Sequence, residues 1–116
     1  VVLCYNASVM NAAERALSVF RCPPHRYNCA QAVCAAFGVD DLLEPMQSCG
    51  GGRAPEGTCG ALYGAIQVAP ELEAQLREAF AAANGATTCR QLKGEGRVPC
   101  EVCVRSACEI LEKLHD

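Results

Sequence analysis

The chain has 116 residues, of which 51% are hydrophobic, and its formal net charge at pH 7 is −3. A chain of this length forms one domain with a modest core, so residues 1–116 are expected to fold as a single domain. The weak negative charge, with three tyrosines, three phenylalanines and no tryptophan, argues against nucleic-acid binding. No apolar run reaches the roughly 18 residues that a membrane-spanning helix needs, so no membrane span is expected.

Apolar residues recur at helical spacing through most of the chain, and polar caps and prolines divide it into segments. Asn28, Thr58 and Thr88 are typical of helix N-caps, and Pro23 and Pro24 end the first helix because neither can extend it. The expected helical segments are residues 8–21, 29–37, 59–69, 70–84, 89–93 and 100–114, with a single turn at 40–46. No strand pattern exceeds a few residues. The predicted fold class is therefore all-α, a compact bundle of about five helices with a glycine-rich loop before the third main helix.

The ten cysteines are the most informative feature of the composition. Such a content is typical either of disulfide scaffolds or of metal and redox proteins. The long helical segments can fold without covalent links, so metal or redox thiols are favoured over a structural disulfide framework. A third interpretation treats the cysteines as small buried hydrophobic residues.

Four of the cysteines fall in the first turn of an expected helix, directly after a predicted cap or a proline. A helix N-terminus offers unpaired N–H groups and about half a positive charge, which lowers the pKa of a cysteine and favours the thiolate. The thiolate is the form that binds metals and attacks disulfides. These four candidate metal ligands are Cys29, Cys59, Cys89 and Cys100.

A glycine-rich stretch separates Cys49 from Cys59. Gly51, Gly52 and Gly60 let the backbone approach a bound group without interference from Cβ, so they are the candidate cofactor-binding residues. The alternative is a flexible connector followed by a core cysteine. No lysine follows the loop, which argues against a phosphate-binding loop.

Two further cysteines are candidate additional ligands. Cys103 forms a C-x-x-C motif with Cys100, and on a helix both sulfurs share one face, which suits a metal chelate or a dithiol. A thioredoxin-like motif would follow a strand, and none is predicted here. Cys49 precedes Cys59 across the glycine-rich loop and is close enough in sequence to reach the same site.

The other cysteines have weaker claims to a site. Cys34 lies about 140° around its helix from Cys29, and Cys108 falls on the apolar stripe of the last helix. Cys4 and Cys22 flank the first helix, where they either form a disulfide or take no part.

The two histidines offer no catalytic arrangement. His25 follows two prolines and His115 is the penultimate residue, so both are expected to be solvated. No Ser/His/Asp or Cys/His pattern has a recognisable spacing, and a hydrolase is not expected.

The cysteine segments follow one another as Cys29-Ala-Gln-Ala-Val, three glycines, Cys59-Gly-Ala-Leu-Tyr-Gly64, Cys89-Arg-Gln-Leu, and Cys100 with Val104. Over residues 27–114 this order resembles the C-GCAxxG-C-C family of bacterial and archaeal redox-active proteins. The resemblance implies a small helical protein whose four shared cysteines are Cys29, Cys59, Cys89 and Cys100. Some members carry twin-arginine signals, which implies a bound prosthetic group. The six additional cysteines depart from the family pattern and suggest a larger or second site.

The leading hypothesis is an iron–sulfur protein, most simply with a [4Fe–4S] cluster, that carries or senses electrons and meets a redox partner protein. One alternative is a thiol–disulfide oxidoreductase that uses Cys100 with Cys103, or Cys59 with Cys49. Others are a structural zinc protein and a partner-binding module whose cysteines are incidental. Enzymatic activity and a homodimer both stay open.

The chain begins Val-Val-Leu without a methionine, so it is expected to be processed or trimmed. Its location is then the cytoplasm or, if a twin-arginine signal has been removed, the periplasm.

Overall fold

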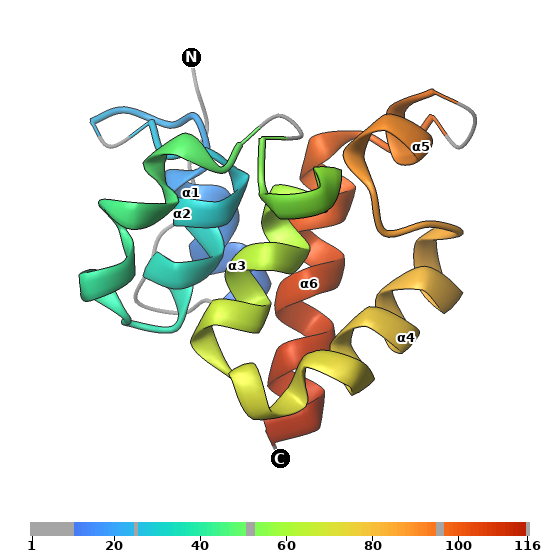
Figure 1. The fold of residues 1–116 in the computed structure, drawn as a ribbon. Coiled ribbons are helices and arrows are strands. Elements are labelled where there is room, and N and C mark those ends of the chain that lie inside the picture. Colours follow the sequence, from blue (N-terminus) through green and yellow to red (C-terminus); the bar gives the residue numbers. More distant parts are fainter. Residues whose placement is uncertain (1–10, 25, 51–52, 95–96, 116) are drawn as a thin grey trace.

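The computed structural model describes residues 11–24, 26–50, 53–94 and 97–115. Within these ranges the chain forms α-helices joined by short 3-10 helices, and its only β-type pairings are two isolated bridges. The α-helices are α1 (Ala12–Val19), α2 (Cys29–Ala36), α3 (Gly60–Val68), α4 (Glu73–Asn84), α5 (Cys89–Lys93) and α6 (Cys100–His115). The 3-10 helices are η2 (Asp40–Leu42), η3 (Pro45–Ser48), η4 (Pro55–Gly57) and η5 (Pro70–Leu72). The predicted all-α bundle is thus confirmed (Figure 1).

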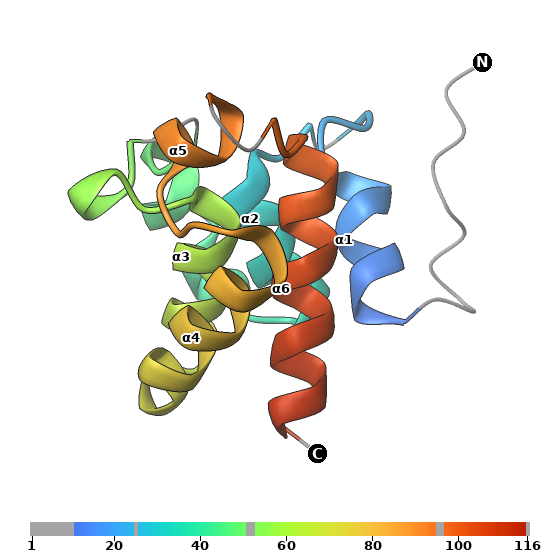
Figure 2. The same ribbon diagram turned by 90° about the vertical axis from the view of Figure 1, so that its right-hand side faces the viewer.

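Helix α6 is the longest element and packs against α1, α2, α3 and α4. Helix α2 packs between α1 and α3 and also contacts α6 (Figures 1 and 2). In Figure 1 the short helix α5 and the start of α6 lie at the upper end of the bundle, and the C-terminus lies at the lower end. The upper end carries the candidate site.

Local sequence explains where α1 and α2 begin. Asn11 and Asn28 each form a complete capping box, in which the asparagine side chain accepts from the N3 backbone N–H and the N3 side chain accepts from the cap N–H. The cap at Asn28 was predicted. Its side-chain amide also donates to the carbonyl oxygens of Met46 and Gln47, at 3.0 Å each, which fixes η3 beside the start of α2.

Three predicted boundaries differ in the structure. Helix α1 begins at Ala12 and ends at Val19, inside the expected 8–21, of which residues 8–10 lie outside the described ranges. Pro70 opens the 3-10 turn η5, and α4 begins only at Glu73. Cys59 is itself the N-cap of α3, so the prediction of Thr58 as that cap is wrong. Thr58 instead ends the η4 turn.

Helices α2 and α3 approach closely because glycine faces α2 from α3. A Cβ built on Gly64 would lie 2.7 Å from the carbonyl oxygen of Ala30 and 3.2 Å from its Cα. Ala30 and Gly64 are both buried. The contact holds the start of α2 against the middle of α3.

We expect the substitution Gly64→Ala to destabilise the protein, although alanine is a better helix former than glycine by about 1 kcal/mol. The added methyl group would force α2 and α3 apart, and overpacking of this kind costs about 1–3 kcal/mol. Urea unfolding measures the change. A Gly64→Ala protein more stable than the wild type would contradict the close packing.

Candidate functional site: a pocket lined by five thiols

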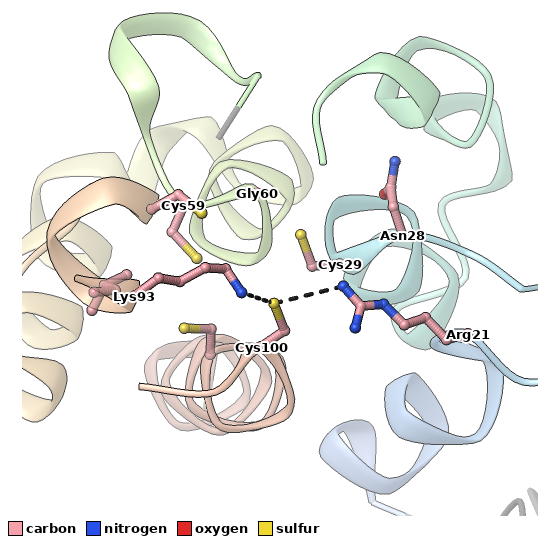
Figure 3. A pocket seen from close by; sticks show the side chains of 10 residues that line it. Arg21, Asn28, Cys29, Cys59, Gly60, Lys93 and Cys100 are labelled. Atoms are coloured by element: carbon pink, nitrogen blue, oxygen red, sulfur yellow. Dashed lines mark hydrogen bonds between the residues drawn. The ribbon is translucent and has the colours of Figure 1, made fainter. Parts of the chain in front are cut away.

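Five cysteines from four helices line one pocket at the upper end of the bundle. The pocket encloses about 410 Å³, including the part open to solvent. Its walls are formed by Arg21, Asn28, Cys29, Cys59, Gly60, Cys89, Leu92, Lys93, Cys100 and Cys103 (Figure 3). The structure thus brings together the four cysteines that were predicted to start helices, and it adds Cys103 of the predicted accessory ligands.

A short backbone pairing holds the start of α3 against the start of α5. Thr58 and Thr88 form an isolated antiparallel bridge, and the Cys59 N–H donates to the carbonyl oxygen of Thr87 at 2.8 Å. Thr88 also caps α5 by accepting from the Gln91 N–H. Cys59 and Cys89, thirty positions apart in sequence, therefore line the same pocket.

A second pairing places Arg21 beside the start of α2. The Arg21 N–H donates to the carbonyl oxygen of Tyr27 at 3.0 Å, and the Tyr27 N–H donates to that of Val19 at 3.0 Å. Arg21 has a φ of +55°, a conformation that few side-chain-bearing residues adopt. The tight turn between α1 and α2 thereby directs the guanidinium group into the pocket (Figure 3).

Cys100 lies between two cations. The ammonium group of Lys93 donates a hydrogen bond to the Cys100 sulfur, and Nη2 of Arg21 lies 3.7 Å from the same sulfur (Figure 3). The hydrogen bond to Cys100 raises the pKa of Lys93 above its ordinary value. Two positive charges therefore adjoin the Cys100 sulfur.

Cys59 and Cys103 form a hydrogen-bonded pair of buried thiols. The bond to Cys103 and burial together raise the pKa of Cys59, while the bond from Cys59 lowers the pKa of Cys103. In the half-buried Cys89, burial raises the pKa and the charge of Lys93 opposes the rise.

Gly60 makes room for the Cys29 sulfur. A Cβ at Gly60 would overlap that sulfur and would lie 2.8 Å from the carbonyl oxygen of Cys49. The prediction that Gly60 allows a close approach at the site fits this geometry. The other two predicted cofactor-binding glycines, Gly51 and Gly52, lie outside the described residues.

Cys49 does not line the pocket, although the sequence suggested it as a ligand. It lies in a separate buried cluster with Cys34, Met46, Ala30 and Ala54. The Cys49 thiol donates a hydrogen bond to the carbonyl oxygen of Pro45 at 3.9 Å.

The remaining described cysteines lie away from the pocket. Cys34 and Cys108 are fully buried, and burial raises the pKa of each thiol to about 12. The assignment of Cys108 to the core stripe of α6 agrees with this burial. Cys22 is in a disulfide. The suggested partner, Cys4, lies outside the described residues. Of the two histidines, His25 also lies outside them, and the side chain of His115 is not described.

Sequence reasoning missed both cations of the pocket. Lys93 follows Cys89 by four positions, one helical turn, and this spacing could have pointed to it. Arg21 carries no such signal, because its place depends on the tight turn that precedes α2.

The five thiols are spread around the pocket rather than gathered on one point. Among the residues with described side chains, no three histidine, cysteine or acidic side chains are grouped as ligands of a metal ion. In the same part of the chain, no helix is long and apolar enough to cross a membrane. Comparisons with models of protein families, with curated proteins and with solved structures gave no match to this chain.

We expect Cys100 to be the first thiol to react with iodoacetamide at neutral pH, because it is half-buried and adjoins two cations. Substituting Lys93→Met should slow its alkylation by roughly three- to tenfold, since the cation that donates a hydrogen bond to the sulfur is lost. Peptide mass spectrometry over time measures the rate. Lys113→Met, at the far end of α6, is the control, and an equal effect of both variants would contradict the assignment.

We also expect the buried thiols to weaken the fold at alkaline pH. The folded Cys108 keeps its proton up to about pH 12, whereas a thiol in the unfolded chain ionises near pH 8.5. Between these values the unfolded state binds fewer protons, so the free energy of unfolding falls by about 1.4 kcal/mol per pH unit for this group.

Removing the Cys108 thiol tests whether it causes the free energy of unfolding to fall as the pH rises. Anaerobic urea unfolding at pH 9, 10 and 11 should show a shallower decline for Cys108→Ala than for the wild type, whatever the absolute stability of the variant. Identical slopes would show that Cys108 is not buried as described.

Proposed function

We propose that the protein is a small redox protein whose five-thiol pocket binds an iron–sulfur cluster. The observation that carries the proposal is the convergence of Cys29, Cys59, Cys89, Cys100 and Cys103 on one pocket from four separate helices. Thiols scattered as incidental hydrophobic residues would not be expected to meet in this way. The four cysteines implied by the family resemblance are all among them.

The donor set suits such a group. Among the described residues, the pocket lining contains five thiols and no histidine or carboxylate, and all-sulfur coordination is typical of iron–sulfur clusters and of soft metal ions. A cluster is wider than a single ion and accepts ligands that lie further apart. Thiols that come from the starts of four helices suit the wider group.

The surrounding groups fit an anionic occupant. Lys93 and Arg21 supply two positive charges at Cys100, which offset the negative charge of several thiolates gathered in one pocket. Cys29 and Cys100 are the first residues of α2 and α6, at the end of each helix that carries the positive partial charge. Gly60 leaves the space beside Cys29 clear.

An iron–sulfur cluster supplies one-electron transfer when it is bound. The chain's own residues would hold it, with Cys29, Cys59, Cys89 and Cys100 as first ligands and Cys103 available as a fifth thiol. Cys59 must lose its proton on ligation, so metal binding is expected to release protons. Leu92, which is buried, forms an apolar part of the pocket wall.

Thiol–disulfide exchange is a second candidate, favoured by the position of Cys100 between two cations. In this reaction the Cys100 thiolate attacks a partner disulfide, and the Cys103 thiolate then displaces the partner. The Cys100–Cys103 disulfide forms with the release of two protons, and the partner disulfide takes up two electrons and two protons to become a dithiol. The alternative pair of Cys59 with Cys49 is not supported, because Cys49 lies outside the pocket.

We expect protein purified without oxygen, or reconstituted with iron and sulfide, to contain both elements in comparable amounts. Substituting Cys59→Ser should lower the bound iron about tenfold, because it removes a ligand from the centre of the pocket. Cys34→Ser is the matched control, since it is also a buried cysteine but lies outside the pocket.

Four results would count against the cluster. Protein that lacks iron and sulfide after reconstitution would overturn it, as would zinc bound without sulfide. Equal loss of iron in Cys59→Ser and Cys34→Ser, with both folded by thermal melting, would remove the pocket as its site. A reversible two-electron titration without metal would favour the thiol–disulfide candidate.

A further inference from the structure

The charges of the chain are distributed unevenly along the bundle. Although the net charge is −3, exposed cations gather at the end that carries the five-thiol pocket. They come from the turn between α1 and α2, from α5 and from the segment that leads into α6, all of which lie at the upper end in Figure 1. These cations are Arg21, Arg26, Arg90, Lys93 and Arg97.

Acidic residues dominate the opposite end. The N–H of Ala12 donates to a Glu112 carboxylate oxygen at 3.3 Å, which places the start of α1, with Glu14, beside the C-terminal part of α6. Glu71 in η5 and Glu73 at the start of α4 lie at the lower end of the bundle (Figure 1).

A few carboxylates belong to the upper end as well. Glu56 lies in η4 and Glu101 in the first turn of α6, whereas Glu95 lies outside the described residues. Among the described residues, the five cations outnumber these two carboxylates, whereas the net charge of the full sequence is negative.

A shallow apolar groove continues from the pocket. It is lined by Leu17, Phe20 and Val102, with Arg21 and Arg105 among the residues around them. Arg21 lines both the groove and the thiol pocket. Val102 is 41% exposed and is the one large hydrophobic residue classed as exposed among those described. An apolar centre beside charged residues is typical of a protein-binding surface.

We propose that this end of the bundle, the basic face, is the docking surface for an acidic protein that exchanges electrons with the pocket. The redox part of this inference rests on the proposed function. Complementary charge steers such partners together and orients them, so that the redox groups face each other. The apolar groove beside Arg21 favours a protein over a nucleic acid, since the face offers few aromatic side chains for stacking.

The test uses the full chain as purified and fluorescent poly-L-glutamate as an acidic polypeptide probe. Anisotropy titrations should show binding that weakens as sodium chloride is raised from about 20 to about 200 mM, because salt over this range increasingly screens the charges on the surface. The double variant Arg90→Gln/Arg97→Asn removes two charges from the basic face without touching the pocket lining. Asparagine tolerates the positive φ of Arg97, which is +51°.

We expect this variant to lose roughly fivefold or more in affinity at low salt. The double variant Arg77→Gln/Lys113→Gln removes the same number of charges elsewhere and should lose less than about twofold. Equal losses of affinity in the two double variants would show that binding responds only to net charge and would contradict the docking surface. The absence of salt-dependent binding would also overturn it.

Two further measurements keep the outcomes distinct. Tighter binding of a DNA duplex than of poly-L-glutamate through the same arginines would replace the protein partner by a nucleic acid. Dimerisation in sedimentation experiments that is lost in Arg90→Gln/Arg97→Asn would identify the face as a self-association surface and contradict the proposal. Iron content, measured on the same samples, should not change, so failure of the cluster and failure of the docking surface can be told apart.

Discussion

The close contact between α2 and α3 is the constraint on which the thiol pocket depends. Gly60 and Gly64 lie one turn apart on α3, and both meet α2 where a side chain would collide, Gly64 with the backbone of Ala30 and Gly60 with the sulfur of Cys29. Because the two helices start side by side, Cys29 and Cys59 enter one pocket. Helix α6 packs against both helices, and its first turn brings Cys100 and Cys103 to them. The bridge between Thr58 and Thr88 brings Cys89.

Electrostatics then decides what this pocket can hold. Several ionised thiols in one partly closed space would repel one another, and desolvation alone favours the protonated forms, as the raised pKa of Cys89 illustrates. Arg21 and Lys93 place two positive charges beside the sulfur of Cys100. The same cations belong to the wider basic face that we propose as the docking surface for an acidic partner.

The sequence predicted the helical class and most helices because their signals are local. The caps at Asn28 and Thr88 depend only on neighbouring residues, and both were predicted correctly. The placement of Cys29, Cys59, Cys89 and Cys100 at helix starts followed from the same signals, but their convergence could not, since it depends on packing between distant helices. Cys49 shows the limit of this reasoning. Nearness to Cys59 in sequence suggested a shared site, whereas the turn at η3 directs Cys49 into a different cluster.

The central claim is that the thiols of one pocket together ligate an iron–sulfur cluster. X-ray absorption at the iron edge of anaerobically prepared protein tests it most directly, because it reports the ligands of the bound iron. The account predicts a first shell of sulfur alone with a second shell of neighbouring iron. A first shell of nitrogen and oxygen, or iron without an iron neighbour, would contradict it.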